Sequence, residues 1–191
     1  MKTFSTSVYE HLILPIINSV APIKQVCWGG SIGLFVGLTP TMGIQMYIVA
    51  AIWAVCWYVF RFRFYLPVGV ALVWISNPIT FLPLYYIFLM IGNTFFQLMQ
   101  WPIVSLDWQT FHQKFQKMSD ESIWKIIEEG SHLLLIDLGL PMLVGSFFVA
   151  IPSAVIFYFA TGALLTRYRK FKASQANLSY EDWCLKYETS N

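Results

Sequence analysis

The sequence predicts an all-α, polytopic membrane helix bundle, and the distribution of charge is the first observation that indicates this fold. Of the 191 residues, 57% are hydrophobic and 12% are charged, whereas a soluble domain has about 25% charged residues. No Asp, Glu, Lys or Arg occurs over 27–60, 64–106 or 138–166. A membrane span needs about 20 apolar residues, so each of these blocks is long enough to cross a bilayer.

The positive charges indicate which ends of these blocks face the cytoplasm. Arg61 and Arg63 separate the first two blocks. Lys and Arg collect on the cytoplasmic side of membrane proteins, so we expect this loop and a basic tail over 167–191 to lie inside a multi-pass protein. The tail opens with four cations: Arg167, Arg169, Lys170 and Lys172.

The first 25 residues are expected to form an interfacial segment. Phe4, Val8 and Leu12 repeat at i,i+4 spacing and would share one face of a helix at the membrane surface. A cleaved signal peptide is disfavoured, because its positive region would contain only Lys2 and because Pro15 interrupts the apolar run.

A stripe of small residues opens the first part of the membrane domain, which we place over 26–166. Gly29, Gly33 and Gly37 lie at i,i+4 spacing. Such a stripe lets the backbone of a second helix approach closely, and packing alone accounts for most stripes of this kind. A second small-residue stripe is the expected partner, and it lies in the third block: Ser146, Ala150 and Ala154.

Two polar segments interrupt the blocks over 26–60 and 66–100. Pro40 and Pro78 each remove a backbone donor, and Gly43 permits unusual backbone angles. We predict two proline-broken helical hairpins, either re-entrant or fully spanning. Backbone groups freed inside a bilayer need partners in protein or in a wet cavity. The polar side chains expected to line such a site and bind substrate are Thr39, Thr41, Gln45, Asn77 and Thr80.

The polar interval over 105–136 predicts amphipathic helices outside the bilayer. Trp108, Phe111 and Phe115 follow a helical pattern, and Ser119 resembles an N-cap of a second helix. These helices are expected to lie on the membrane surface or to cap the bundle. Residues 138–166 are then the last transmembrane helix, with two prolines that predict kinks, at 141 and 152.

No motif for a metal, a nucleotide or a catalytic centre is present in the sequence. Cys27, Cys56 and Cys184 lack the spacing of metal ligands, and CxxC, HExxH, Walker and GxGxxG motifs do not occur. Thr39 and Ser76 offer hydroxyl groups without a neighbouring base. We therefore expect no enzyme activity, no metal, no cofactor and no nucleic-acid partner.

The chain resembles the DUF2062 family of small bacterial membrane proteins over about residues 20–165. Three segments carry the resemblance: 32–40 with Gly43 and Gln45, 74–80 with Pro83, Tyr85 and Tyr86, and Pro141 with Gly145-Ser146. The resemblance implies an inner-membrane protein and brings no established activity. Some relatives are joined to glycosyltransferase-like domains, which the resemblance links to envelope glycolipids.

Two functions remain open from the sequence. The first is a transporter or a lipid- or glycolipid-handling facilitator with a polar site at the two breaks. An ion-coupled carrier is disfavoured, because the charge-free blocks contain no ionisable carboxylate or cation. The alternative is an accessory or scaffold subunit without transport of its own. The expected partners are membrane lipids and either another membrane protein or a second copy of the chain.

Overall fold

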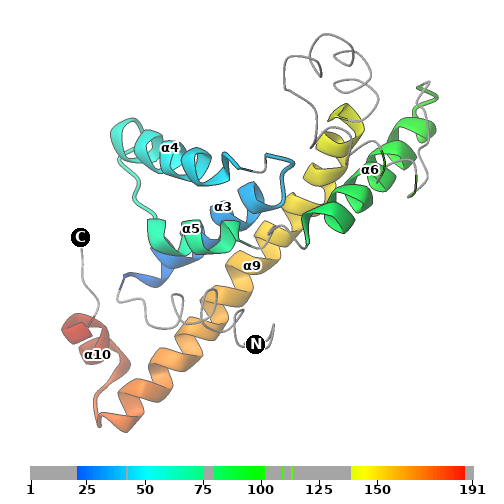
Figure 1. Cartoon of the computed structure of the whole chain (residues 1–191). Helices are drawn as coiled ribbons and strands as arrows, with labels where there is room; N and C mark the ends of the chain where they lie inside the picture. Colours follow the sequence, from blue (N-terminus) through cyan, green and yellow to red (C-terminus); the bar gives the residue numbers. More distant parts are fainter. Residues whose placement is uncertain are drawn as a thin grey trace. The chain divides into compact units, whose positions relative to one another are not determined.

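The computed structural model describes residues 21–41, 43–74, 80–101 and 139–187, with the isolated positions 109 and 113. In this part of the chain the fold is all-α, with six helices and no strand, which confirms the predicted class. The expected interfacial helix over 1–20, most of the amphipathic interval, Asn77 and Pro78 lie outside the described residues. The helices, shown in Figure 1, are α3 (Ile23–Gly37), α4 (Gln45–Tyr58), α5 (Leu66–Val73), α6 (Phe81–Leu98), α9 (Leu140–Gln175) and α10 (Tyr180–Tyr187).

The chain forms two compact units. The first unit contains α3, α4, α5, α10 and α9 from Ile151 onward. The second unit contains α6, α9 up to Ala150, and the short segment Leu38–Pro40.

Helices α3 and α5 of the first unit meet through glycine. A Cβ added to Gly33 would lie 2.7 Å from the Cα of Gly69 and would also clash with the Gly69 carbonyl oxygen. A Cβ on Gly29 would clash in the same way with the carbonyl oxygen of Tyr65. The two backbones therefore touch at this crossing. The predicted glycine stripe is a packing surface at Gly29 and Gly33, where its partner is α5 and not the expected stripe at 146–154.

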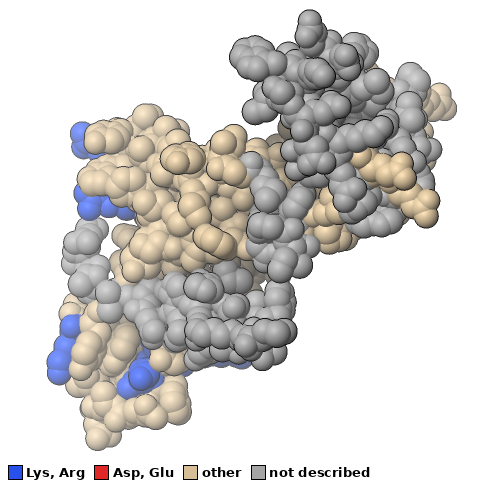
Figure 2. Space-filling view, in the orientation of Figure 1, with Lys and Arg blue, Asp and Glu red and all other residues tan. Residues whose placement is uncertain are grey.

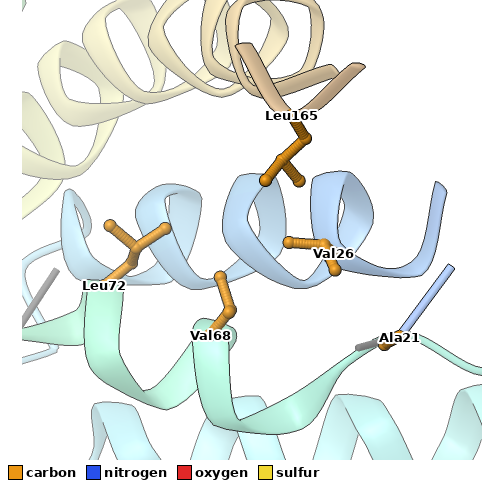
Figure 3. Packing of buried hydrophobic residues seen from close by; sticks show 5 residues of the cluster. All are labelled: Ala21, Val26, Val68, Leu72 and Leu165. Atoms are coloured by element: carbon orange, nitrogen blue, oxygen red, sulfur yellow. The ribbon is translucent and has the colours of Figure 1, made fainter. Parts of the chain in front are cut away.

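Two apolar clusters hold the first unit together. In Figure 3, Val68 and Leu72 point from α5 toward α3, and Leu165 points toward α3 from α9. Burying a side chain of this size contributes about 1.5–3 kcal/mol, so α3 is held from two sides. The second cluster joins α3, α4, α5 and the loop before α5 through Val36, Val49, Phe64 and Val73.

The second unit has its own close crossing, between α6 and the start of α9. A Cβ on Gly145 would lie 2.8 Å from the Gly92 nitrogen and would clash with the carbonyl oxygen of Phe88. A Cβ on Gly92 would clash with the backbone of Pro141. The rings of Phe95 and Phe148, 5.1 Å apart, continue the contact.

Helix α9 is the one helix in the described ranges that is long and apolar enough to cross a membrane. Its 36 residues rise about 54 Å, against a hydrocarbon core of about 30 Å. Only 28% of its most apolar window is buried, whereas the core helix of a soluble protein would be mostly buried. Pro152 lies inside the helix, and the helix continues beyond Thr166 to Gln175.

The other helices are shorter. Helix α4 has 14 residues and α5 has eight, so α5 rises only about 12 Å. Helix α6 is apolar, with 18 residues. The described ranges are thus all-α and contain one helix that can span a bilayer. The polytopic bundle with two proline-broken hairpins stays a prediction.

Candidate functional site

The chain leaves the helical conformation at the first predicted break. Pro40 lies between Gly37, where α3 ends, and Gln45, where α4 begins. The Ile44 amide donates a hydrogen bond of 3.2 Å to the Thr41 carbonyl oxygen and so closes a turn. Gly43 has a φ of +91°, which glycine adopts without the strain that a Cβ would cause. Pro40 and Gly43 therefore shape this turn.

The predicted polar residues are distributed over both units. Thr41 and Gln45 belong to the first unit, and Thr39 and Thr80 belong to the second. The three threonines are half-buried, and Gln45 is 4% exposed. All four have interaction partners in the structure. Their common role as a polar lining, together with Asn77, stays a prediction.

Gln45 is the most informative of these residues. It is a buried amide at the first position of a helix whose other buried residue is Val49. Burying an amide costs free energy unless its hydrogen bonds are made. At the start of α4 the buried Gln45 amide therefore lies beside the first backbone N–H groups of the helix, which have no partner within the helix.

Helix α4 carries no charge and exposes most of its apolar side chains. Tyr47 is 77% exposed, Val55 is 50% exposed and Tyr58 is 81% exposed. A surface of this kind is typical of a membrane or protein contact. Helix α9 also exposes apolar side chains, among them Ile156 and Phe159.

Arg169 is a buried cation that the sequence analysis did not single out. It belongs to α9, is 2% exposed, and its Nη2 donates a hydrogen bond of 2.7 Å to the Ala21 carbonyl oxygen. The sequence analysis placed this residue in a basic cytoplasmic tail. The missed signal is the i,i+4 repeat of buried positions along α9: Thr161, Leu165, Arg169 and Ala173.

A second feature that the sequence analysis missed is an open hollow of about 340 Å³, lined by Trp57, Tyr58, Arg61 and Arg63. Both arginines are exposed. On the face shown in Figure 2, the described cations gather at two places, the end of α4 and the C-terminal part of α9 with α10. The arginine pair had been predicted only as a topology signal.

The described residues contain no group of three or more His, Cys, Asp or Glu side chains arranged to hold a metal ion. Cys27, Cys56 and Cys184 are free thiols. The chemistry that the described part of the chain offers is therefore hydrogen bonding at the break and positive charge beside aromatic rings at the α4–α5 loop.

Comparison with curated proteins and with solved structures gives no match. One family model does match, over residues 9–174. The matched segment includes both proline motifs, the glycines of both helix crossings and nearly all of α9. The chain belongs to the DUF2062 family, described as an uncharacterized protein conserved in bacteria, as its motifs predicted.

Proposed function

We propose that this chain is a multi-pass protein of the bacterial inner membrane that facilitates the movement of a lipid or another headgroup-bearing substrate along a polar site at its helix breaks. The observation that carries the proposal is Gln45, a buried amide directly after the turn at Gly43 and at the start of an exposed apolar helix. Polar groups at the broken ends of helices form the substrate sites of many transporters.

The charge pattern favours a facilitator over an ion-coupled carrier. Residues 25–60 contain no Asp, Glu, Lys or Arg, and coupled carriers place such groups within their spans. A neutral substrate, or a headgroup that stays near water, can be bound by hydroxyl and amide groups alone. Thr41 and Gln45 would then bind polar atoms of the substrate and would satisfy the ends of the broken helices.

Cysteine accessibility tests whether water reaches the break. In a background without Cys27, Cys56 and Cys184, a membrane-impermeant thiol reagent is applied from each side to the variants Thr41→Cys and Gln45→Cys. Labelling from either side is expected. Val49→Cys, one turn further along α4 and fully buried, is the matched control and should stay unlabelled. The cytoplasmic controls are Arg63→Cys and Lys172→Cys.

Transfer of a fluorescent phospholipid between leaflets of proteoliposomes tests the activity itself. Gln45→Leu should slow the transfer about tenfold, since leaving the polar partners of one amide unpaired costs about 1.4 kcal/mol. Val49→Ala, at the buried control position on α4, should leave the transfer rate near that of the unmodified protein. Protection of both break positions, together with transfer no faster than in protein-free vesicles, would contradict the proposal.

A scaffold is the second candidate function, and the glycine crossings favour it. At Gly33–Gly69 and Gly92–Gly145, backbone lies directly on backbone. Contacts of this kind make helix pairs rigid and leave no space at the crossing itself. If the breaks are closed to water, these rigid pairs with their exposed apolar faces would serve to dock another membrane protein or a second copy of the chain.

A further inference from the structure

We propose that the hollow formed by Trp57, Tyr58, Arg61 and Arg63 binds the phosphate of an anionic phospholipid headgroup. This inference rests on the membrane location in the proposed function and not on a passage at the helix break. It concerns the loop over 59–65, between α4 and α5, and not the polar residues predicted from the sequence.

The loop is held firmly by its neighbours. Phe64 is 2% exposed and packs in the cluster of α3, α4 and α5 side chains. The indole Nε1 of Trp53 donates a hydrogen bond of 3.2 Å to the Phe64 carbonyl oxygen. The Tyr65 amide donates a hydrogen bond of 3.0 Å to the Gln25 carbonyl oxygen. The backbone on either side of Arg63 is therefore anchored, which limits the entropy that the site loses on binding.

The aromatic side chains orient one of the two guanidinium groups. The Arg63 guanidinium carbon lies 4.5 Å from the centroid of the Trp57 ring. Trp57 in turn makes an edge contact of 4.7 Å with Trp53 and stacks on Tyr58 at 6.0 Å. A guanidinium that lies on a ring keeps its N–H groups free at the edge, where they can hold a phosphate by two parallel hydrogen bonds.

The second guanidinium is carried by a strained residue. Arg61 has a φ of +50°, in the left-handed region that residues with a Cβ rarely adopt. Residues held in this region cluster at ligand sites. Arg61 and Arg63 share one hollow, and no described carboxylate pairs with either of them. Its volume of about 340 Å³ lies within the range of small-ligand sites, about 300–1,000 Å³.

The surroundings of the hollow favour a lipid over a soluble anion. Helix α4, which ends at the hollow, exposes Val55 and Tyr58 and has no charge. An acyl chain attached to the bound phosphate would therefore find an apolar surface beside it. Arg together with Trp and Tyr is also the usual composition of a protein surface at the cytoplasmic membrane interface.

Native mass spectrometry of the full chain in detergent tests the assignment, with phosphatidylglycerol, phosphatidylcholine and inorganic phosphate as probes. The unmodified protein should retain phosphatidylglycerol in preference to phosphatidylcholine. The double variant Arg61→Gln/Arg63→Gln should bind phosphatidylglycerol about 30-fold more weakly, since each interfacial arginine contributes about fivefold. The matched control Arg167→Gln/Lys170→Gln, also exposed and basic, should change the affinity less than twofold.

A charge-conserving variant distinguishes recognition of the phosphate by the planar guanidinium from attraction by any positive charge. Arg63→Lys keeps the charge but loses the planar group that lies on Trp57 and can donate two parallel hydrogen bonds. We therefore expect a loss of about two- to threefold, smaller than the loss caused by Arg63→Gln, because about one hydrogen bond is lost while the charge is kept. Unchanged binding in this variant and in the double variant would overturn the proposal. Displacement of the lipid by millimolar inorganic phosphate would also overturn it, by assigning the hollow to a soluble anion. Because lipid retention is measured without any transfer assay, failure of this site and failure of the facilitator function are distinguishable.

Discussion

The two close helix crossings in the described ranges use the same contact in different sequence settings. In the first unit, α3 and α5 meet at Gly33 and Gly69, and in the second, α6 and α9 meet at Gly92 and Gly145. The α3 side of the first crossing was predicted from a periodic stripe, although its partner α5 was not, whereas the glycines of the second crossing are isolated in the sequence. The second crossing shows that one glycine on each helix is enough for the two backbones to touch. A periodic glycine stripe makes such a contact easier to predict from the sequence but is not required for it.

The largest expected effect comes from adding a methyl group at either crossing. Gly33→Ala and Gly145→Ala should each lower the free energy of unfolding by about 3 kcal/mol, because the new Cβ meets rigid backbone and one helix must move away. The measurement is thermal or denaturant unfolding in detergent, followed by circular dichroism. If one crossing tolerates the methyl group and the other does not, only the sensitive crossing has the backbone contact described here.

The control for these variants is Gly162→Ala on α9. Among the described residues, a Cβ at Gly162 meets only the Cys27 sulfur, at an ordinary 3.5 Å. Replacing a helical glycine by alanine where space allows should raise the free energy of unfolding by about 0.5–1 kcal/mol. A loss at Gly162 equal to that at Gly33 would indicate a general intolerance of substitution and would contradict the argument from backbone contact.

The next largest effect on the free energy of unfolding is expected at Arg169, a buried cation of the first unit. No buried cation is found among the described residues of the second unit. Arg169→Met should lower the free energy of unfolding by about 2–3 kcal/mol, because the Ala21 carbonyl oxygen loses its buried donor. The exposed neighbour Arg167 is the control, and Arg167→Met should change the same quantity by less than about 0.5 kcal/mol. Equal effects of the two variants would show that the buried hydrogen bond contributes nothing.

The sequence predicts the fold class because long charge-free blocks have few solutions other than membrane helices, and it predicts the first break because Pro40 and Gly43 act on the backbone locally. Helix partners depend on which faces meet in three dimensions, which explains why α5 was missed as the partner of Gly29 and Gly33. The burial of Arg169 was missed for a related reason. A cation after an apolar block normally lies in water, and only the packing around Ala21 shows otherwise.

The polar site is the least predictable part of the molecule. Thr41 and Gln45 were predicted because polar side chains in a charge-free block are conspicuous. Their shared role with Thr39 and Thr80 stays a prediction, since it depends on geometry that local patterns do not encode. The hollow at Arg61 and Arg63 was missed because the sequence gives the charges without the ring of Trp57 that orients one of them.

A smaller effect compares one serine beside each crossing. Ser31 of α3 and Ser146 of α9 are both buried, but the Ser146 hydroxyl donates a hydrogen bond of 2.7 Å to the Leu143 carbonyl oxygen, whereas the Ser31 hydroxyl has no partner among the described residues. Ser31→Ala should therefore raise the free energy of unfolding by about 1 kcal/mol. Ser146→Ala should leave it unchanged or lower it by up to about 1 kcal/mol. Identical results for the two variants in the same unfolding experiment would show that the hydroxyls have equivalent surroundings.

The smallest change in the free energy of unfolding is expected at two residues with left-handed backbone angles, Arg61 in the first unit and Gln100 in the second. Gln100 has a φ of +57° directly after α6, where its amide and that of Trp101 donate 3.0 Å hydrogen bonds to the last carbonyl groups of the helix. Glycine is preferred at this position of a helix end, so Gln100→Gly should raise the free energy of unfolding by about 0.5 kcal/mol. Arg61→Gly relieves the same backbone strain and should give a similar gain.

The two variants should differ only in function. If the strain at Arg61 is retained because its guanidinium binds phosphate, Arg61→Gly gains stability and loses about fivefold in affinity for phosphatidylglycerol. Gln100→Gly gains stability and leaves lipid binding unchanged. Unfolding and lipid retention, measured on the same preparations of both variants, test whether the left-handed conformation of Arg61 is needed for lipid binding. A stabilised Arg61→Gly protein that still binds the lipid as the unmodified protein does would mean that the left-handed turn serves only to reverse the chain between α4 and α5.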